Sequence, residues 1–388
     1  MSVYDMRAGH LLSGELGPWD TFTPAGYPAF LAALYWAFGS VHTVVGLVQA
    51  FLSALTVALT YKLALVISAN RAIALIAALA IAAHLPTVLY SGLLLSETWF
   101  SFLLVASALL LVRAVAIDRV SYAMLGGLLL GVAATVRPSL VLVLPFLPLF
   151  FFHGLARSSL QTLRFSVLTY ALLLAPIAAH SVHNSRLVDR WVPTSTNGGL
   201  NFYLNFADAR SLNFMEGKFK HQITPIPNLL RYDTDEFVDR PFYEDRYFYK
   251  RGIGLIVDEP IRLLRVFRSF REALGFGQQN YWPGWGPWRF WLPFESRAFA
   301  ILVVLPGLVG LVRACKRRAP FDSGGAGWLW IGFLIVGALV TSALFLGDPR
   351  IRVPYDPFFA IFAAATYVGF AQHVGLRRDV RRSSPTLT

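Results

Sequence analysis

The amino-acid sequence predicts an all-α polytopic membrane protein with a small mixed domain on its outer face. The chain has 388 residues and is 56% hydrophobic but only 14% charged, whereas soluble domains carry about 25% charged residues. Apolar segments long enough to cross ~30 Å of hydrocarbon recur along the chain. One long hydrophilic stretch, at about 183–296, interrupts them and is too long to be a simple loop.

About nine membrane-spanning helices are expected, because only a helix satisfies its own backbone polar groups in lipid. Two apolar segments are short and are separated only by Arg137-Pro138, so one broken helix is the alternative there. Two spans are preferred, since a single span would reverse every later loop. The predicted spans are 42–66, 71–90, 97–115, 122–136, 138–153, 164–182, 297–313, 327–345 and 353–373.

The distribution of arginine supports this topology. With nine spans, every short basic loop falls on one side of the membrane, as the positive-inside rule expects. The C-terminus is then cytoplasmic, the 183–296 stretch lies outside, and the protein is a multi-pass protein of the cytoplasmic membrane. The formal net charge of +12 is explained in this way, and no nucleic-acid partner is expected. The composition, rich in Ala, Arg and Val, favours a bacterial cell envelope protein. The basic loops hold Arg71, Arg113, Arg119, Arg157, Arg164, Arg313 to Arg318 and Arg377 to Arg382.

Five regions follow from this pattern. A remnant of a first outer loop precedes a bundle of about six spans, and the outer domain precedes a group of about three spans and a basic tail. Within the outer domain, residues 259–276 have the pattern of a basic amphipathic helix, which would lie in the lipid head-group layer; a specific phosphate site is the alternative. The regions are 1–41, 42–182, 183–296, 297–373 and 374–388.

Charged residues beside the outer ends of spans are candidates for function, because charge near lipid is costly. Glu97 begins a span, where it is either a charge favoured by the helix dipole or a site residue. Arg350 and Arg352 flank Ile351 and would point the same way in an extended segment. Two guanidiniums there suit a phosphate or pyrophosphate; snorkelling to lipid head groups is the alternative.

Two further polar residues lie in similar positions. Arg137 falls at an outer turn, where snorkelling is the default explanation. His84, near Pro86, has the surroundings of a packed or hydrogen-bonded histidine. No metal-ligand or nucleotide-binding motif is present, so no cofactor is expected and the sequence does not support a divalent metal site.

Five segments of the chain resemble, in order, the polytopic GT-C glycosyltransferases of the mannosyltransferase and aminoarabinose-transferase-like branch. The resemblance spans nearly the whole chain, and it implies a GT-C-like fold. The segments are "TPAGYPAFLAALYWAFG", "LPTVLYSGLLLSETWF", "GVAATVRPSLVLVLPF", "STNGGLNFYLNFAD" and "DPRIRVPYDPFFAI".

The resemblance implies transfer of a sugar from a polyprenyl-phosphate donor to a glycan, lipid or protein acceptor on the outer face of the membrane, by inverting displacement. A first-loop carboxylate acts as general base, and arginines stabilise the departing phosphate. Glu97 matches an outer acid that assists the active site, and Arg137, Arg350 and Arg352 match arginines of the family. The residues assigned to substrate binding, in or beside the matched segments, are Tyr27, His84, Asn197 and Asn201.

The first loop departs from the family pattern. Tyr4 and Ala8 fit Tyr-x-x-x-Ala, which puts the catalytic aspartate one residue before Met1. We therefore expect a first span and this aspartate upstream, and the activity of the chain as written stays open. Asp5 is the candidate substitute, but a helix would rotate it away from the expected face. Asp20 is at too shifted a position to indicate a metal site.

Two other function classes remain as alternatives. The first is a pseudoenzyme that keeps the fold and has lost its base. The second is a transporter or flippase of lipid-linked glycans, which would need a polar path through the spans. The predicted spans are almost free of charge, apart from Lys62 near an inner end, and this disfavours transport.

Overall fold

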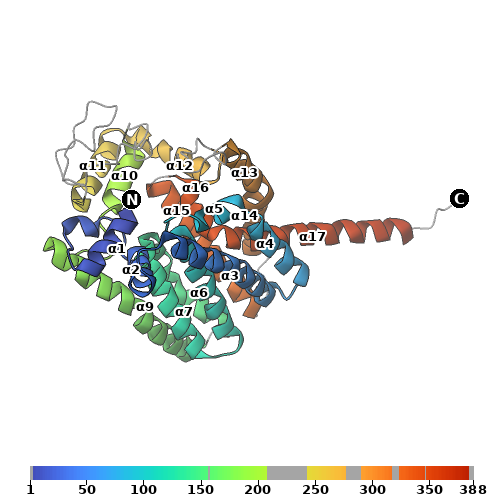
Figure 1. Cartoon of the computed structure of the whole chain (residues 1–388). Coiled ribbons are helices and arrows are strands. Elements are labelled where there is room, and N and C mark those ends of the chain that lie inside the picture. Colours follow the sequence, from blue (N-terminus) through green and yellow to red (C-terminus); the bar gives the residue numbers. More distant parts are fainter. Residues whose placement is uncertain are drawn as a thin grey trace.

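The computed structural model describes residues 3–155, 158–207, 243–276, 290–316, 323–345 and 347–383. Within these ranges every element is a helix or a helical turn (Figure 1), in agreement with the predicted all-α fold. The elements are α1 (Val3–Ser13), η1 (Pro18–Thr21), α2 (Gly26–Phe38), α3 (His42–Ser68), α4 (Arg71–Ala82), α5 (Leu85–Ser91), α6 (Glu97–Ala116), α7 (Val120–Val136), η2 (Pro138–Leu142), η3 (Leu144–Phe146), α8 (Leu147–Gly154), α9 (Ser159–Val188), α10 (Gly198–Phe206), α11 (Asp245–Asp258), η6 (Pro260–Leu264), α12 (Arg265–Ala273), α13 (Leu292–Phe299), η8 (Ala300–Val304), α14 (Leu305–Lys316), α15 (Ser323–Phe345), α16 (Pro349–Arg352), η9 (Val353–Tyr355) and α17 (Asp356–Ser383).

Six helical segments in the described ranges are long and apolar enough to cross a membrane. The pair α4 and α5, which bends by 56°, is a seventh if it counts as one span. The chain is thus polytopic, as its long apolar segments predict, but two of the nine predicted spans, 122–136 and 138–153, form shorter apolar helices, Val120–Val136 and Pro138–Gly154. The six segments are His42–Ser68, Glu97–Ala116, Ser159–Val188, Leu292–Lys316, Gly325–Phe345 and Pro349–Val374.

The two short predicted spans form separate helical segments on either side of Arg137. This residue has an extended backbone (φ −137°, ψ 105°) that ends α7, and Pro138 starts the next turn. Arg137 contacts Glu97 at the start of α6, whereas Gly154 at the end of α8 lies against Val115 near the end of α6. The run from η2 to α8 therefore follows the length of α6, antiparallel to α7, which favours the two-span interpretation.

The bundle is built around α6, the most buried of the candidate spans, with 72% of its apolar window inside the molecule. It packs against α3, α7 and α15. Beside it, α7 meets α9 through small residues. A Cβ on Gly131 would come within 2.1 Å of the Leu173 carbonyl oxygen, and one on Gly127 within 2.7 Å of that of Thr169. Glycines at these positions let the two backbones approach closely, as is typical of helix packing in membranes.

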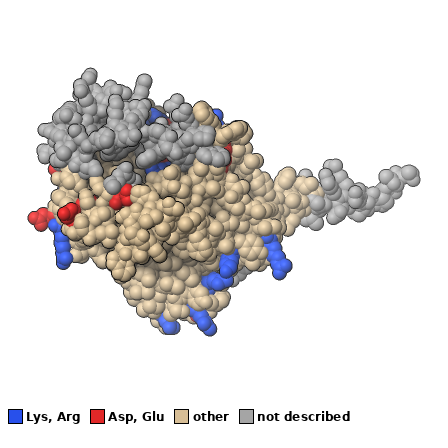
Figure 2. Space-filling model, viewed as in Figure 1, with Lys and Arg blue, Asp and Glu red and all other residues tan. Residues whose placement is uncertain are grey.

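We name the two ends of the bundle after α6. The Glu97 end carries α1, α2, α10 to α12 and α16, and the Arg119 end carries the α6–α7 turn and the start of α9. Arg113, Arg119 and Arg164 are exposed at the Arg119 end, and the charged side chains along the lower edge of Figure 2 are all Lys or Arg. Exposed Lys and Arg side chains also occur at the Glu97 end, on α11 and α12, and the side of the membrane on which each end lies stays a prediction.

The sequence predicts a mixed outer domain, but in the described residues of this region the regular elements are all helical. Its elements are α10, α11, η6 and α12, and the predicted amphipathic helix at 259–276 forms η6 and α12. Residues 208–242 and 277–289 of this region lie outside the described ranges. The C-terminal tail, predicted to begin at 374, starts as a continuation of α17.

Candidate functional site

Three residues from distant parts of the chain meet at the Glu97 end and form what we call the Glu97 centre. Arg137 Nη2 lies 2.8 Å from Glu97 Oε1, and Arg350 Nε, 253 positions along the chain from Glu97, donates to the same oxygen. Arg137 Nη1 also donates to the backbone carbonyl of Arg350, at 3.3 Å. One carboxylate therefore holds two guanidiniums side by side.

Local structure fixes each member of this centre. Glu97 is the first residue of α6, where the positive end of the helix dipole favours an acid. The guanidinium carbon of Arg137 lies 5.5 Å from the centre of the Phe100 ring, one helical turn beyond Glu97. Helix α2 presses on the end of α7, because a Cβ on Gly26 would come within 2.7 Å of the Val136 nitrogen. This glycine of the "GYP" segment therefore has a packing role beside the break at Arg137.

The carboxylate is buried and the arginines reach the surface. The side chain of Glu97 is 1% exposed, that of Arg137 is 15% exposed, and that of Arg350 is 22% exposed. Glu97 engages Arg137 through Nη2 and Arg350 through Nε, and each guanidinium carries five N–H donors. The carboxylate thus offsets the repulsion between two cations whose side chains are partly exposed.

Asp348 sets the position of Arg350. Its Oδ1 accepts a hydrogen bond from the Arg350 backbone N–H at 2.8 Å, which caps the short helix α16. Burial raises the pKa of the Asp348 carboxyl, and the nearby Glu97 adds to this, whereas the Arg350 N–H opposes it. The positive charges of Arg350 and Arg137 lower this pKa as well, so the two arginines favour the negative charge of Asp348 and burial opposes it.

The prediction that Arg350 and Arg352 point the same way is wrong. Residues 349–352 form one turn of α-helix rather than an extended segment, and two residues along a helix differ by about 200° in direction. Arg352 turns inward, is 1% exposed, and lies with Nε 3.2 Å from Asp356 Oδ1. Its Nη1 donates to the Leu274 carbonyl at 3.3 Å, which ties α16 to the end of α12.

Arg352 belongs to a second buried group, which we call the Arg352 centre. His84 Nε2 lies 3.7 Å from both Asp356 Oδ2 and Glu295 Oε1, and the ring of Phe299 contacts both His84 and Arg352. His84 Nδ1 lies 2.8 Å from Thr87 Oγ1. The side chains of Arg352, Asp356 and His84 are at most 1% exposed. This centre joins α5, α13 and α17.

In the first loop, helix α1 directs the side chains of Tyr4 and Asp5 towards different neighbours. Tyr4 packs edge-on against Tyr27, with ring centres 5.1 Å apart. Asp5 accepts a hydrogen bond from Tyr35 Oη at 2.6 Å and lies 3.3 Å from His42 Nε2. The helix therefore turns Asp5 towards α2 and the start of α3, as the expected rotation indicates.

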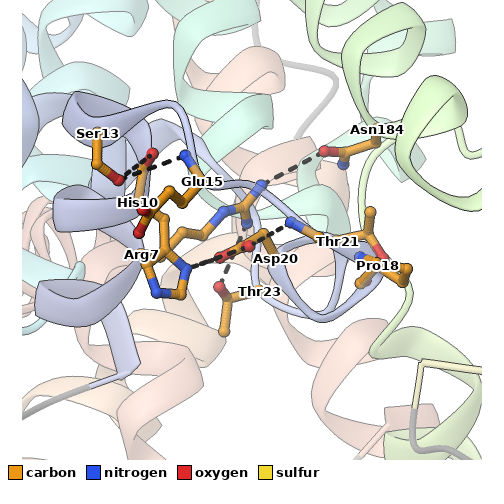
Figure 3. Close-up of polar contacts among 10 residues, drawn as sticks. Arg7, His10, Ser13, Glu15, Pro18, Asp20, Thr21, Thr23 and Asn184 are labelled. Atoms are coloured by element: carbon orange, nitrogen blue, oxygen red, sulfur yellow. Dashed lines mark hydrogen bonds and ion pairs between the residues drawn. The ribbon is translucent and has the colours of Figure 1, made fainter.

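A polar network that sequence reasoning missed anchors the first loop to α9. Figure 3 shows Arg7 reaching between Thr23 and Asn184, with Nη1 3.3 Å and Nη2 3.4 Å from their side-chain oxygens, while His10 Nδ1 lies 3.0 Å from Asp20 Oδ1. Burial lowers the pKa of Arg7 to about 10, and the charge of Asp20 opposes this shift. Asn184 continues the network to the Thr194 carbonyl at 2.6 Å, so the loop is held against the start of the outer domain.

Tyr27 supports the segment that leads into α6. It is fully buried, and its hydroxyl donates to Gln49 Oε1 at 2.8 Å. Gln49 Nε2 in turn donates to the carbonyls of Ser91 and Leu93, at 3.1 and 2.7 Å. The substrate-binding role assigned to Tyr27 stays a prediction, and its contacts give it a supporting role just before Glu97.

The segment that opens the outer domain packs on α11. Asn197 Oδ1 accepts from Ser195 Oγ at 2.9 Å, and Asn201 lies half-buried on α10. The Gly199 N–H donates to Asp245 Oδ1, and a Cβ on Gly199 would come within 2.0 Å of the Asp245 carbonyl oxygen. Glycine is required there for close approach, and substrate binding by Asn197 and Asn201 stays a prediction.

Comparison with solved structures finds distant similarities. The chain is similar to the archaeal oligosaccharyltransferase AglB from Archaeoglobus fulgidus, solved in complex with an inhibitory peptide and a dolichol-phosphate. The identity is 12% and the TM-score 0.46, over 99% of this chain and 48% of that one. It is also similar to an Archaeoglobus fulgidus oligosaccharyltransferase in complex with Zn and sulfate, at 13% identity and a TM-score of 0.43, over 92% of this chain and 42% of that one.

The chain thus spans about half the length of the solved proteins that it matches. No family model matches its sequence. No curated protein matches it either. In the part of the chain that the structure describes, no three His, Cys, Asp or Glu side chains are grouped so that they could hold a metal ion.

Several buried polar residues escaped the sequence analysis. Gln49 and Asn184 lie inside helices, where nothing in the local pattern marks them. The sequence does contain a signal for Asp356, because this residue stands four positions after Arg352, the spacing of an ion pair on one helix face. The sequence contains no such signal for Glu295, because its partner His84 is about 210 residues away along the chain.

Proposed function

We propose that this chain is a membrane glycosyltransferase that moves a sugar from a polyprenyl-phosphate donor to an acceptor on the outer face of the membrane. The observation that carries this proposal is the Glu97 centre, in which one buried carboxylate holds Arg137 and Arg350 together. The acceptor is a glycan, a lipid or a protein.

Two independent lines of argument overlap in three residues. The motif resemblance picks Glu97, Arg137, Arg350 and Arg352 from three separate segments, each on the predicted outer side, and all but Arg352 meet in the Glu97 centre. The geometry brings these three into one cluster with partly exposed guanidiniums. A cluster of this kind at a membrane boundary suits a phosphate, because planar guanidiniums donate to two oxygens at once.

The reaction proposed is a single inverting displacement. The acceptor hydroxyl attacks the anomeric carbon as the bond from that carbon to the phosphate oxygen breaks, and the electron pair leaves with the phosphate. Arg137 and Arg350 stabilise the charge that grows on the departing phosphate. Glu97 is a positioning residue that keeps both arginines aligned.

The hydroxyl proton goes to a carboxylate base. Within the chain, the candidate base is Asp5. We assign no donor contact to Arg352, whose guanidinium is engaged by Asp356 and the Leu274 carbonyl.

The test is sugar transfer in membranes that contain the chain, with a panel of labelled polyprenyl-phosphate sugars and separate extraction of lipid, glycan and protein products. We expect transfer from one donor, and we expect Arg137→Ala to abolish most of it. Arg113→Ala, an exposed arginine at the Arg119 end, is the matched control and should leave the rate unchanged.

Other outcomes would point to the alternative classes. Donor binding that depends on Arg137, without transfer from any donor, would indicate a pseudoenzyme. Movement of labelled donor across the membrane without transfer would indicate a flippase. Transfer that is unaffected by Arg137→Ala would overturn the site assignment.

A further inference from the structure

A second basic site lies at the opposite end of α6. A cavity of about 280 Å³ opens there, between the α6–α7 turn and the start of α9. Helix α6 has 20 residues, and a rise of 1.5 Å per residue gives a separation of roughly 30 Å from the Glu97 centre. The cavity is lined by Asp118, Arg119, Val120, Ser121, Gln161, Arg164 and Phe165.

Specific backbone and side-chain contacts build the walls of this cavity. Asp118 adopts a left-handed conformation (φ 49°), and the Arg119 N–H donates to the Ala114 carbonyl at 2.9 Å, which closes the turn. Gln161 Nε2 donates to Asp118 Oδ2 at 3.1 Å and ties the turn to α9. The buried ring of Phe165 forms an apolar wall. These contacts fix the turn and the Phe165 wall, and Asp118, Arg119, Ser121 and Arg164 line the open side of the cavity.

The charge in the cavity is positive. Arg119 and Arg164 both line it, and no ion pair within the described ranges involves either of them. The one carboxylate in the lining, Asp118, is already engaged by Gln161. Two guanidiniums and the Ser121 hydroxyl give an anion with several oxygens a complete set of donors.

The surroundings of the cavity are apolar and face outwards. Leu160 and Leu163 of α9 are 78% and 60% exposed, and Ile117 of the turn is 51% exposed. These side chains flank Gln161 and Arg164, so a ligand bound to the arginines would have hydrocarbon contacts beside it. Basic pockets between membrane-spanning helices are suited to phosphate-bearing lipid head groups for this reason.

We propose that this cavity binds the phosphate group of an anionic phospholipid from the leaflet at the Arg119 end. The head group contacts Arg119, Arg164 and Ser121, and the acyl chains lie against Leu160 and Leu163. The site is independent of the sugar-transfer proposal, because it lies at the other end of a spanning helix. Its occupancy ties the α6–α7 turn to α9 at the level of the head groups.

The test uses the purified full chain and native mass spectrometry with phosphatidylglycerol and phosphatidylcholine. We expect retained phosphatidylglycerol, and a loss of at least about tenfold in its binding in the double variant Arg119→Ala/Arg164→Ala. Arg71→Ala, an exposed arginine at the start of α4, is the matched control and should bind as the wild type does. Arg119→Lys/Arg164→Lys keeps the charge and should bind in part.

Three results would overturn the proposal. Equal binding of phosphatidylglycerol by the wild type and by a double variant that elutes as a folded monodisperse protein would remove the cavity as the site. Inorganic phosphate that displaces the lipid at comparable concentration would assign the cavity to free phosphate instead. Binding of phosphatidylcholine as strong as that of phosphatidylglycerol would contradict the role of the two arginines.

Discussion

Arg350 and Arg352 are two residues apart and belong to two unlike buried centres. In the Glu97 centre, one carboxylate serves two guanidiniums, and both cations are partly exposed. In the Arg352 centre, one guanidinium and one histidine face the carboxylates of Asp356 and Glu295. The first centre sets two cations against one carboxylate near the surface, and the second sets one guanidinium against two carboxylates in the interior.

This difference shows how to distinguish a candidate binding site from a structural ion pair when both consist of arginine and acidic residues. Two properties distinguish them, namely the ratio of acidic to basic side chains and the exposed fraction of the guanidinium. A fully buried pair has no surface that a ligand could contact. Residue type and separation along the chain do not distinguish a binding site from a structural ion pair. The four predictions below test this distinction, from the largest expected effect to the smallest.

Arg350→Ala should reduce the rate of sugar transfer by about 100-fold to 1,000-fold, the usual effect of removing one donor to a developing negative charge. Glu97 keeps Arg137 as a partner, so folding should be retained. Arg350→Lys should recover only part of the rate, because an ammonium lacks the planar fork. Initial rates in membranes, normalised to folded protein, measure this effect, and a rate within about twofold of wild type would contradict it.

Arg352→Ala should act mainly on stability. It leaves Asp356 as an uncompensated buried charge, a change that costs about 3–5 kcal/mol in comparable buried pairs. The thermal midpoint of the purified protein should fall, and transfer per folded molecule should change little. Replacement of both partners, Arg352→Met with Asp356→Leu, should restore part of the loss. An unchanged midpoint with a large loss of transfer would mean that Arg352 binds the donor after all.

Glu97→Gln should lower kcat/KM for the donor by about 10-fold to 100-fold. The change removes the charge that holds the two guanidiniums together, and small misplacements of site groups have effects of this size. Glu97→Asp should recover part of the rate. Steady-state kinetics with a fixed acceptor measure it, and Glu272→Gln, an exposed pair with Arg268 on α12, is the control. If the acid merely braced the fold, the thermal midpoint would fall while the kinetics of the folded fraction stayed unchanged.

Tyr27→Phe should have the smallest effect. It removes the hydroxyl that donates to Gln49, and the loss of one buried hydrogen bond costs about 1 kcal/mol. We expect a slightly lower thermal midpoint and no change in KM for the donor or the acceptor. A higher KM with an unchanged midpoint would favour the substrate contact predicted for Tyr27.

Much of the fold follows from the sequence because lipid permits few solutions. The long apolar segments have to be helices, and the Arg137-Pro138 pair has to end one of them. The α16 turn carried a readable signal as well. Asp348 before Pro349 is the pattern of a capping residue followed by proline at the first helical position, and it would have indicated a helix rather than an extended segment around Arg350.

The sequence by itself determined that the chain is an all-α membrane protein, and it offered Glu97, Arg137, Arg350 and Arg352 among its candidate site residues. Only the tertiary structure decided that Arg137 and Arg350 share the Glu97 carboxylate and that Arg352 turns away to Asp356. The physical reason is that hydropathy and local pattern act over a few residues. An ion pair between positions 253 apart depends on how helices from both halves of the chain pack around α6.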